Sequence, residues 1–367
     1  MSGLDSVVEG ASVVVCCGSG GVGKTTTAAA IGLHAAETGR RVVVVTIDPA
    51  RRLADALGLP DGLTGEPQRI PSETGDGELW AMMLDAEAMF ERVVRANATA
   101  PEQADRIVAN RFYRNMSSAL SGTQEYMASE ALHELHGDER FDLVVVDTPP
   151  TRNAIEFLEA PGVLTRFLDH PVFKLMMAPT RTGLRVFNAA TQPMLRLIGR
   201  VVGSDVLSDA VAFFQAFAGM EAGFRQRADA VAKLLRAEAT EFVLVTSPQR
   251  DALIEAAWFG EQLGERGYGV AATVVNRVHP SFGKATAASA AKKARRATDD
   301  GDHDAAAIWT NLAQLCEISE AERAEVAAHL PTGDDDQAAG PVVEVPLLPT
   351  DVHDLESLDH LGNHLFA

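Results

Sequence analysis

The sequence predicts an α/β fold with a mostly parallel, doubly wound sheet, and three observations support this class. Seven short apolar segments recur along the 367 residues, and six of them are rich in β-branched residues. Their valine runs are continuous rather than alternating, which is typical of strands covered on both faces. Helix-length stretches lie between several of them, and such alternation favours parallel pairing. The expected strands are residues 12–17, 41–47, 78–84, 143–147, 242–246, 270–276 and 342–348.

The expected helices complete this alternation and add a second helical part. Residues 25–38, 49–57 and 252–266 have the length and composition of helices between strands. Residues 85–135 and 153–238 are helical without a convincing strand. We therefore expect a helical subdomain, inserted after the early strands and again after the strand at 143–147, in a single domain that spans residues 1–367.

Two kinds of segment stand out within this plan. Residues 173–179 and 209–220 of the second helical region are rich in Met and Phe. Such side chains suit a hydrophobic core, and they also suit a surface that accommodates varied apolar partners. Residues 281–305 and 331–341 consist mainly of small, charged and turn-forming residues, and they are expected to be flexible.

The composition narrows the classes of partner. The 51 acidic and 32 basic side chains give a net charge of −19, which argues against a nucleic-acid binder, because such proteins depend on clustered Lys and Arg. Three cysteines, Cys16, Cys17 and Cys316, do not form a disulfide framework or a zinc motif. Neither a basic leader nor an apolar span of about 18 residues is visible. A cytoplasmic protein is expected, with any membrane role exerted through a partner.

A phosphate-binding loop follows the first expected strand. Residues 18–25, GSGGVGKT, match G-x-x-x-x-G-K-[ST] between a strand and a helix, which is the context that this motif requires. The glycines permit a backbone that turns its N–H groups toward a triphosphate, Lys24 would neutralise phosphate oxygens, and Thr25 would bind Mg²⁺. A tight turn without a ligand is the alternative. The expected phosphate-contacting residues are Gly20, Gly21, Val22, Gly23, Lys24, Thr25 and Thr26.

Two aspartates end other expected strands. Asp48 follows the strand at 41–47 and Asp147 closes the strand at 143–147, and ligands bind at the carboxyl ends of strands in open α/β sheets. One carboxylate near Mg²⁺ and one near an attacking water would suffice for phosphoryl transfer to water. Each aspartate also precedes a proline-containing helix start, so a capping role is the alternative.

These segments carry a family resemblance. SGGVGKTT at 19–26, TIDPARRLAD at 46–55 and DTPPTRN at 147–153 resemble the phosphate loop, switch I and switch II of the arsenical pump-driving ATPase family, ArsA, which has a P-loop NTPase fold. That family includes the cytosolic factor that delivers tail-anchored proteins to membranes. The segments VVNRVHP and EVPLLPTDV resemble its adenine-side loops, so the resemblance covers nearly the whole chain. Within the family, the sequence resembles an actinobacterial branch described as ArsA-like or anion-transporting ATPases.

The resemblance implies a role for each matching residue. Asp48 would position or activate the hydrolytic water and lie near the metal, with Lys24 assisting at the phosphates, and Asp147 would lie near Mg²⁺. Asn276 would recognise the adenine, with Pro346 or Leu347 near the base. The family's members work as dimers that close around ATP.

The chain also departs from the family's pattern. Ser19 occupies the place of an early lysine that reaches the partner's nucleotide, so either a heterodimer with a related subunit that keeps this lysine, or an arginine such as Arg51 or Arg152, would supply the charge. Arg51 stands where the family has His, and Arg152-Asn153 where it has Gly-His. The metalloid-binding cysteines and a Cys-x-x-Cys pair are missing, so neither arsenite activation nor zinc is expected.

The sequence leaves open several physiological functions for such an ATPase. The first is membrane-associated transport of an anion or solute, through an integral membrane partner. The second is a targeting chaperone for apolar membrane-protein segments. The others are a nucleotide-gated scaffold and a positioning ATPase of the ParA and MinD type, although the long helical regions count against the latter.

Overall fold

The computed structural model describes two compact units of the chain. The described residues are 3–71, 75–111, 123–171, 204–330 and 340–367. One unit comprises Met1–Met83, Glu139–Thr151 and Glu238–Ala367, and the other comprises Leu84–Asp138 and Arg152–Ala237. We call them the sheet unit and the helical unit, because every described strand lies in the first.

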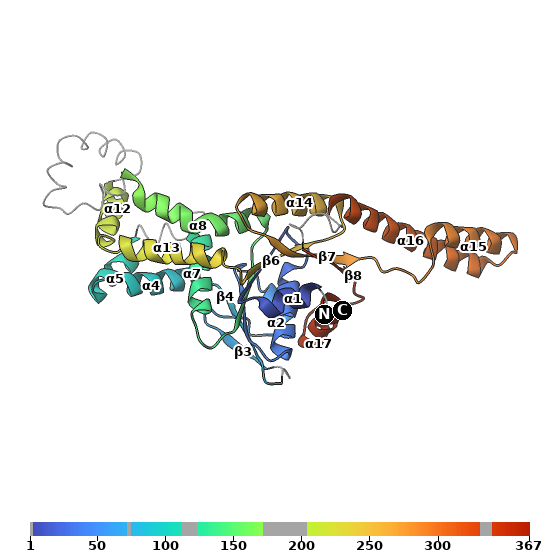
Figure 1. Cartoon of the computed structure of the whole chain (residues 1–367), viewed down its shortest axis with the longest axis horizontal. Coiled ribbons are helices and arrows are strands. Elements are labelled where there is room, and N and C mark those ends of the chain that lie inside the picture. Colours follow the sequence, from blue (N-terminus) through green and yellow to red (C-terminus); the bar gives the residue numbers. More distant parts are fainter. Residues whose placement is uncertain (1–2, 72–74, 112–122, 172–203, 331–339) are drawn as a thin grey trace. The chain divides into compact units, whose positions relative to one another are not determined.

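The sheet unit contains an eight-stranded sheet with the order β3-β4-β2-β5-β1-β6-β7-β8 (Figure 1). All neighbouring strands pair in parallel except β3, which runs antiparallel to β4. The predicted parallel, doubly wound α/β sheet is therefore confirmed. The sequence did not reveal β3, because its three residues, QRI, are too few and too polar to stand out as a strand. The strands are β1 (Val13–Gly18), β2 (Arg41–Thr46), β3 (Gln68–Ile70), β4 (Glu78–Met83), β5 (Leu143–Asp147), β6 (Thr240–Thr246), β7 (Val270–Val278) and β8 (Val342–Pro346).

Helices cover both faces of this sheet. On one face Val14, Val44 and Val145 pack in the same cluster as side chains of α1, α2 and α17. On the other face Val275 packs with Leu253 of α14 and Val326 of α16. Burial on both faces explains the continuous valine runs of the strands. The helices of this unit are α1 (Gly3–Gly10), α2 (Lys24–Glu37), α3 (Arg52–Ala56), α14 (Arg250–Glu265), α15 (Ala287–Asp299), α16 (His303–His329) and α17 (Leu355–Leu365).

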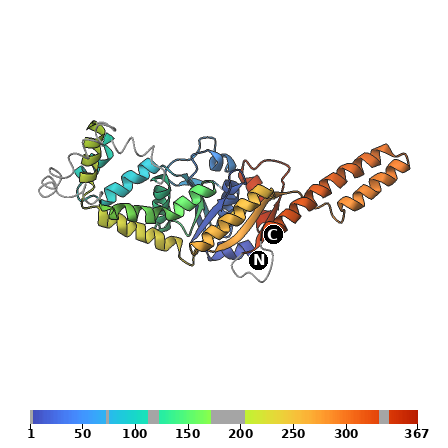
Figure 2. The ribbon, with the colours of Figure 1, turned by 90° about the horizontal axis from the view of Figure 1, so that it is seen from above.

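Helix α15 and the beginning of α16 lie side by side as a hairpin (orange to red in Figures 1 and 2). Much of the segment at residues 281–305 is therefore helical, and its expected flexibility stays a prediction. Alanine favours helix, and Thr286 and Ser289 form a reciprocal capping box at the start of α15. The Lys293 ammonium lies 4.1 Å from the ring centroid of Trp309, which ties the two helices together. Residues 331–339 lie outside the described part of the chain.

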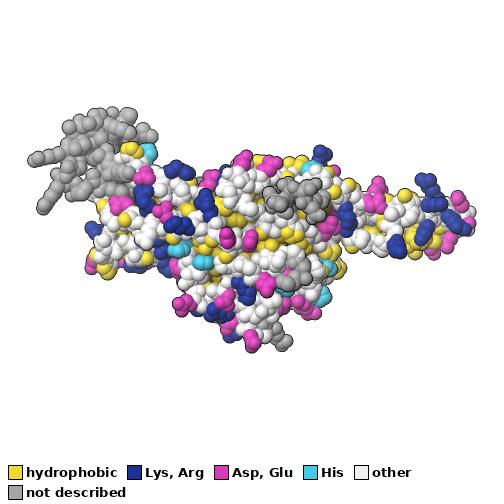
Figure 3. Space-filling view, viewed as in Figure 1, with side chains coloured by type: hydrophobic (Ala, Val, Ile, Leu, Met, Phe, Trp, Pro, Cys, Tyr) yellow, Lys and Arg dark blue, Asp and Glu magenta, His cyan; other side chains and the backbone are white. Residues whose placement is uncertain are grey.

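The hairpin also carries a concentration of positive charge. Figure 3 shows dark blue side chains gathered along it, and the exposed basic residues of α15 are Lys292, Lys293, Arg295 and Arg296. Arg296 pairs with Asp300 at 4.0 Å. Four basic side chains within five residues contrast with the net charge of −19 of the chain.

The helical unit packs around an aromatic and methionine-rich core. Phe213, Phe217, Met220 and Phe224 are all buried in one cluster. Of the two alternatives for the Met- and Phe-rich stretches, core packing therefore holds for these side chains, whereas residues 173–179 lie outside the described residues. None of the described helices is both long and apolar enough to cross a membrane. The helices are α4 (Ala86–Asn97), α5 (Pro101–Val108), α7 (Thr123–His136), α8 (Thr151–Asp169), α12 (Ser204–Ala216) and α13 (Glu221–Leu235).

A buried carboxylate links two helices of this unit. Glu130 of α7 is 0% exposed and accepts hydrogen bonds from the Tyr126 hydroxyl and from Arg227 Nε of α13, the latter at 2.7 Å. Burial and the adjacent Glu130 charge raise the pKa of Tyr126, so its hydroxyl stays a donor. Each Glu130 oxygen therefore has a hydrogen-bond partner.

Candidate functional site

The phosphate loop connects β1 to α2 with a backbone that only glycine can adopt at two points. Gly23 has φ +98°, and a Cβ there would lie 2.2 Å from Nδ2 of Asn276. At Gly18, a Cβ would lie 2.0 Å from the carbonyl oxygen of Val245. Any side chain at either position would therefore displace the loop, which explains why the motif fixes glycine at its two ends. Gly20 and Gly21 are exposed at the loop's crest.

Lys24 is the first residue of α2, and its side chain folds back into the loop. It is 7% exposed, and its Nζ donates a hydrogen bond of 2.8 Å to the carbonyl oxygen of Ser19. Burial lowers the pKa of Lys24, while the nearby carboxylate of Asp147 opposes the shift. The ammonium is thus held inside the loop, where a phosphate oxygen would replace the Ser19 carbonyl as its acceptor. Thr26, on the same turn, is partly buried.

Asp147 closes β5 directly beneath the first turn of α2. Its Oδ2 accepts hydrogen bonds of 2.8 Å from the hydroxyls of Thr25 and Thr46. Its Oδ1 is buried and has no hydrogen-bond partner. Burial raises the pKa of Asp147 to about 6, although the two hydroxyls and Lys24 act in the opposite direction.

This arrangement fits a hard divalent cation. Mg²⁺ prefers oxygen ligands and is commonly held by one or two protein groups plus phosphate and water. The unpartnered Oδ1 of Asp147 and the hydroxyl oxygen of Thr25 are two such ligands. They lie close together, because the Thr25 hydroxyl donates a hydrogen bond to the other oxygen of the same carboxylate. A buried carboxylate oxygen without a partner is costly unless something binds it. Two of the three residues expected to hold Mg²⁺, Thr25 and Asp147, are therefore in direct contact.

Asp48 lies at the same edge of the sheet, after β2. β2 pairs with β5 such that Thr46 stands beside Asp147, and the Asp48 charge contributes to the raised pKa of Asp147. The Oδ1 of Asp48 accepts a 3.0 Å hydrogen bond from the amide of Ala50, which orients the carboxylate. Its Oδ2 lies 3.5 Å from Nη1 of Arg52, a contact that the sequence did not suggest.

The end of β7 supports the loop from its other side. Asn276 is 8% exposed, and its Nδ2 donates a 2.9 Å hydrogen bond to the carbonyl oxygen of Val22. Arg277 adopts φ 64°, unusual for a residue other than glycine, and donates to the carbonyl oxygen of Gly21 at 3.2 Å. The Asn276 amide nitrogen is thus engaged with the loop itself, so recognition of adenine by this residue stays a prediction.

A cavity of about 350 Å³ adjoins the loop on this side. Leu347 lines it together with Gly20, Gly21 and Val22. His279 and Glu322 close another part of it, joined by a 2.8 Å contact between Nδ1 and Oε1. Pro346 ends β8 one residue before Leu347. The cavity has an apolar wall beside the phosphate loop, where a flat base could lie.

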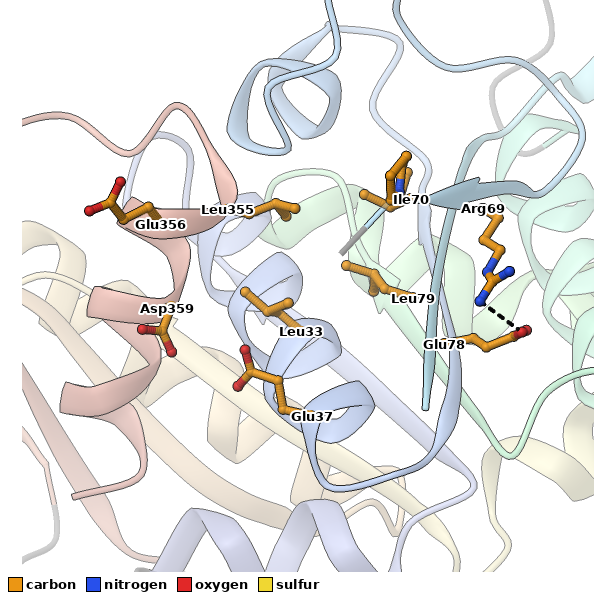
Figure 4. A pocket seen from close by; sticks show the side chains of 10 residues that line it. Leu33, Glu37, Arg69, Ile70, Glu78, Leu79, Leu355, Glu356 and Asp359 are labelled. Atoms are coloured by element: carbon orange, nitrogen blue, oxygen red, sulfur yellow. Dashed lines mark ion pairs between the residues drawn. The ribbon is translucent and has the colours of Figure 1, made fainter. Parts of the chain in front are cut away.

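A larger cavity of about 920 Å³ lies at the opposite end of α2 and is not suited to phosphate (Figure 4). Its floor is apolar, formed by Leu33, Leu79 and Leu355 among others, and Glu37 and Asp359 stand on its rim. Burial and the charge of Asp359 raise the pKa of Glu37. Carboxylates that already repel each other would repel a polyanion, so the smaller cavity at the loop is the candidate site.

Comparison with known proteins agrees with this geometry. A model of the anion-transporting ATPase family, ArsA, matches residues 11–300. The chain belongs to this family. The resemblance inferred from the loop and the two aspartate segments is therefore confirmed, together with the expected fold.

Three relatives show how far the similarity extends. The arsenical pump-driving ATPase of Acidiphilium multivorum is 27% identical over 353 residues, covering 94% of this chain and 46% of its own length. The ATPase GET3 of Malassezia globosa is 29% identical over 160 residues, covering 42% of this chain and 44% of its own. Protein Rv2184c of Mycobacterium tuberculosis is 33% identical over 165 residues, covering 43% and 39%. The chain thus spans less than half the length of these relatives.

Proposed function

We propose that this chain binds ATP with Mg²⁺ and hydrolyses it. The observation that carries the proposal is the Asp147 carboxylate, which is buried beside Thr25 with one oxygen unpartnered, beneath a loop that holds Lys24. Family membership supports the same conclusion. Thr25 and Asp147 would hold Mg²⁺, which when bound would offset the negative charge that develops during phosphoryl transfer.

Each side chain at the loop has a distinct part in this proposal. Backbone N–H groups of the loop and the Lys24 ammonium would bind the phosphates. Thr25 and Asp147 would hold the cation, and Thr46 keeps the Asp147 carboxylate in place through its 2.8 Å hydrogen bond. Asp48, oriented by the Ala50 amide, would hold the attacking water and accept its proton. Leu347 would pack near the base.

The substitution Asp48→Asn tests this mechanism. The amide keeps the shape of the side chain but cannot accept the proton from water, so ATP hydrolysis should fall by about 10²- to 10⁴-fold while ATP affinity changes little. Single-turnover hydrolysis and equilibrium binding of a fluorescent ATP analogue measure the two effects. Asp55→Asn, an exposed aspartate of α3, is the matched control and should hydrolyse ATP as the parent does. Unchanged turnover in Asp48→Asn would remove Asp48 from the mechanism.

The physiological output that we favour is membrane-associated transport of an anion or solute. A relative that matches 94% of this chain is named for driving an arsenical pump. Arsenite itself is not the species that we propose, because Cys16 and Cys17 are buried in β1 and burial raises the pKa of Cys17 to about 12. Crosslinking in the ATP state should recover an integral membrane protein with several spans. Recovery of varied single-span proteins would instead indicate a targeting chaperone.

We also propose that the chain works as a dimer, as the family resemblance implies. The alternative sources of the charge that Ser19 cannot supply are a lysine-bearing partner subunit and an arginine of this chain. Turnover by the purified chain distinguishes them, because a required heterodimer predicts negligible hydrolysis by the chain alone. We favour a source other than Arg51, because its Nη2 donates to the carbonyl oxygen of Pro60. The side chain of Arg152 lies outside the described residues.

A further inference from the structure

We propose that Arg52 supplies, from within this chain, a positive charge to the phosphoryl group during its transfer, an inference that rests on the proposed ATPase function. Arg52 opens α3, directly after the segment that carries Asp48. Its Nη1 lies 3.5 Å from Oδ2 of Asp48. The guanidinium therefore already stands beside the carboxylate that we assign to the attacking water.

The guanidinium is held loosely, as a group that must move onto a ligand should be. The Arg52 side chain is 62% exposed, and 3.5 Å is longer than a good charge-assisted hydrogen bond. Its neighbour Arg51 is held differently. Arg51 donates to the Pro60 carbonyl at 2.5 Å, and a Cβ at Gly62 would contact its guanidinium at 3.5 Å. Of the two consecutive arginines, Arg52 is thus the one that contacts Asp48.

The positive charge of Arg52 acts on the phosphate loop. Its charge is one of the causes that lower the pKa of Lys24, whose ammonium lies inside the loop. Asp48 and Asp147 contribute negative charge around the loop, while Lys24, Arg52 and Arg277 contribute positive charge. Of these three cations, Arg52 is the one that contacts Asp48.

The chemistry of hydrolysis gives such a cation a definite task. The bond between the terminal phosphorus and its bridging oxygen breaks to release ADP, and the water oxygen forms the new bond to phosphorus. The proton of the water passes to Asp48 and then to phosphate or solvent, while Arg52 keeps its own protons throughout. Negative charge shifts toward the bridging and peripheral oxygens as this occurs, and a planar guanidinium can donate to two of them.

The test compares Arg52→Gln with the matched variant Arg51→Gln. Arg52→Gln should bind ATP within about threefold of the parent but hydrolyse it about 100-fold more slowly, because the lost contact forms mainly in the transition state. It should also fail to retain ADP in the presence of aluminium fluoride, a mimic of the transferring phosphoryl group. Arg51→Gln should match the parent in all three measurements. Arg52→Lys should recover only part of the turnover, since lysine is a point charge.

Retention of ADP and aluminium fluoride by Arg52→Gln, with parental turnover, would overturn the proposal. An indirect role through Asp48 is distinguished by the double variant Asp48→Asn with Arg52→Gln. If Arg52 only orients Asp48, its removal should have no further effect on ADP retention in the Asp48→Asn background, and that outcome would also overturn it. A parent chain that binds no nucleotide would contradict the proposed function as well, whereas an active parent with an active Arg52→Gln contradicts the role of Arg52 alone.

Discussion

Two buried carboxylates, one in each unit, differ in a way that separates structure from function. Glu130 of the helical unit is 0% exposed, and both of its oxygens accept hydrogen bonds, from Tyr126 and Arg227. Asp147 of the sheet unit is 1% exposed, but its two hydrogen bonds converge on one oxygen and the other has none. A buried carboxylate whose two oxygens both accept hydrogen bonds from the protein indicates a structural role. A buried carboxylate with one oxygen lacking a partner indicates a binding site for a ligand.

The largest expected effect on stability comes from breaking the ion pair between Glu130 and Arg227. Arg227→Ala leaves the Glu130 charge buried without its cation, which should destabilise the helical unit by about 3–5 kcal/mol. Hydrogen exchange of the amides of α7 and α13 measures this loss directly, since these helices carry the two partners. A loss below about 1 kcal/mol would show that Glu130 is not held as an ion, and would remove the contrast with Asp147.

The same helix provides a matched control. Arg225 of α13 pairs with Asp169 at 3.1 Å, but both side chains are exposed, at 36% and 51%. Such exposed pairs contribute about 0–1 kcal/mol, so Arg225→Ala should change exchange rates in α13 only slightly. A difference between the two variants therefore reports burial rather than the loss of an arginine from this helix.

The contrast also explains what the sequence could predict. Valine-rich runs predicted six of the seven expected strands, because burial on both faces imposes the same residue choice along a whole strand. The loop and Asp147 were predictable because the chemistry of phosphate and Mg²⁺ demands particular residues at strand ends. The roles of Arg52 and Arg277 were not predictable, because the direction of an arginine side chain depends on contacts made after folding. The three residues of β3 are too few to form a recognisable pattern. Helix α15 was missed because its alanines and charged residues show no apolar run, although alanine favours helix.

The second prediction concerns the pH dependence caused by Asp147. Its pKa in the folded protein is about 6, above its ordinary value of 3.8, so the unfolded chain releases the proton first as pH rises. Asp147 therefore destabilises the folded state progressively between about pH 4 and 6, by up to about 3 kcal/mol at pH 7. Asp147→Asn, which carries no charge, should be more stable than the parent at pH 7 without Mg²⁺ or nucleotide, and this advantage should disappear near pH 4.

Chemical denaturation of both proteins across this pH range measures the difference, in which the other titrating groups cancel. Mg²⁺ with ATP should reverse the order at pH 7, because the parent gains a ligand for Oδ1 and the variant does not. A constant difference between the two proteins from pH 4 to 7 would contradict the raised pKa of Asp147.

The smallest expected effect concerns a single hydroxyl, that of Thr25. In the absence of ligand it donates to Oδ2 of Asp147 at 2.8 Å, and with Mg²⁺ it should bind the metal instead. Thr25→Ala should therefore weaken ATP binding by about 1–2 kcal/mol in the presence of Mg²⁺ and much less without it. Thr25→Ser keeps the hydroxyl and should behave as the parent. Titration of ATP at increasing Mg²⁺ concentration separates these outcomes. An equal loss of ATP affinity with and without the metal would mean that the Thr25 hydroxyl serves only as a hydrogen-bond donor to Oδ2 of Asp147, as the Tyr126 hydroxyl does for Glu130.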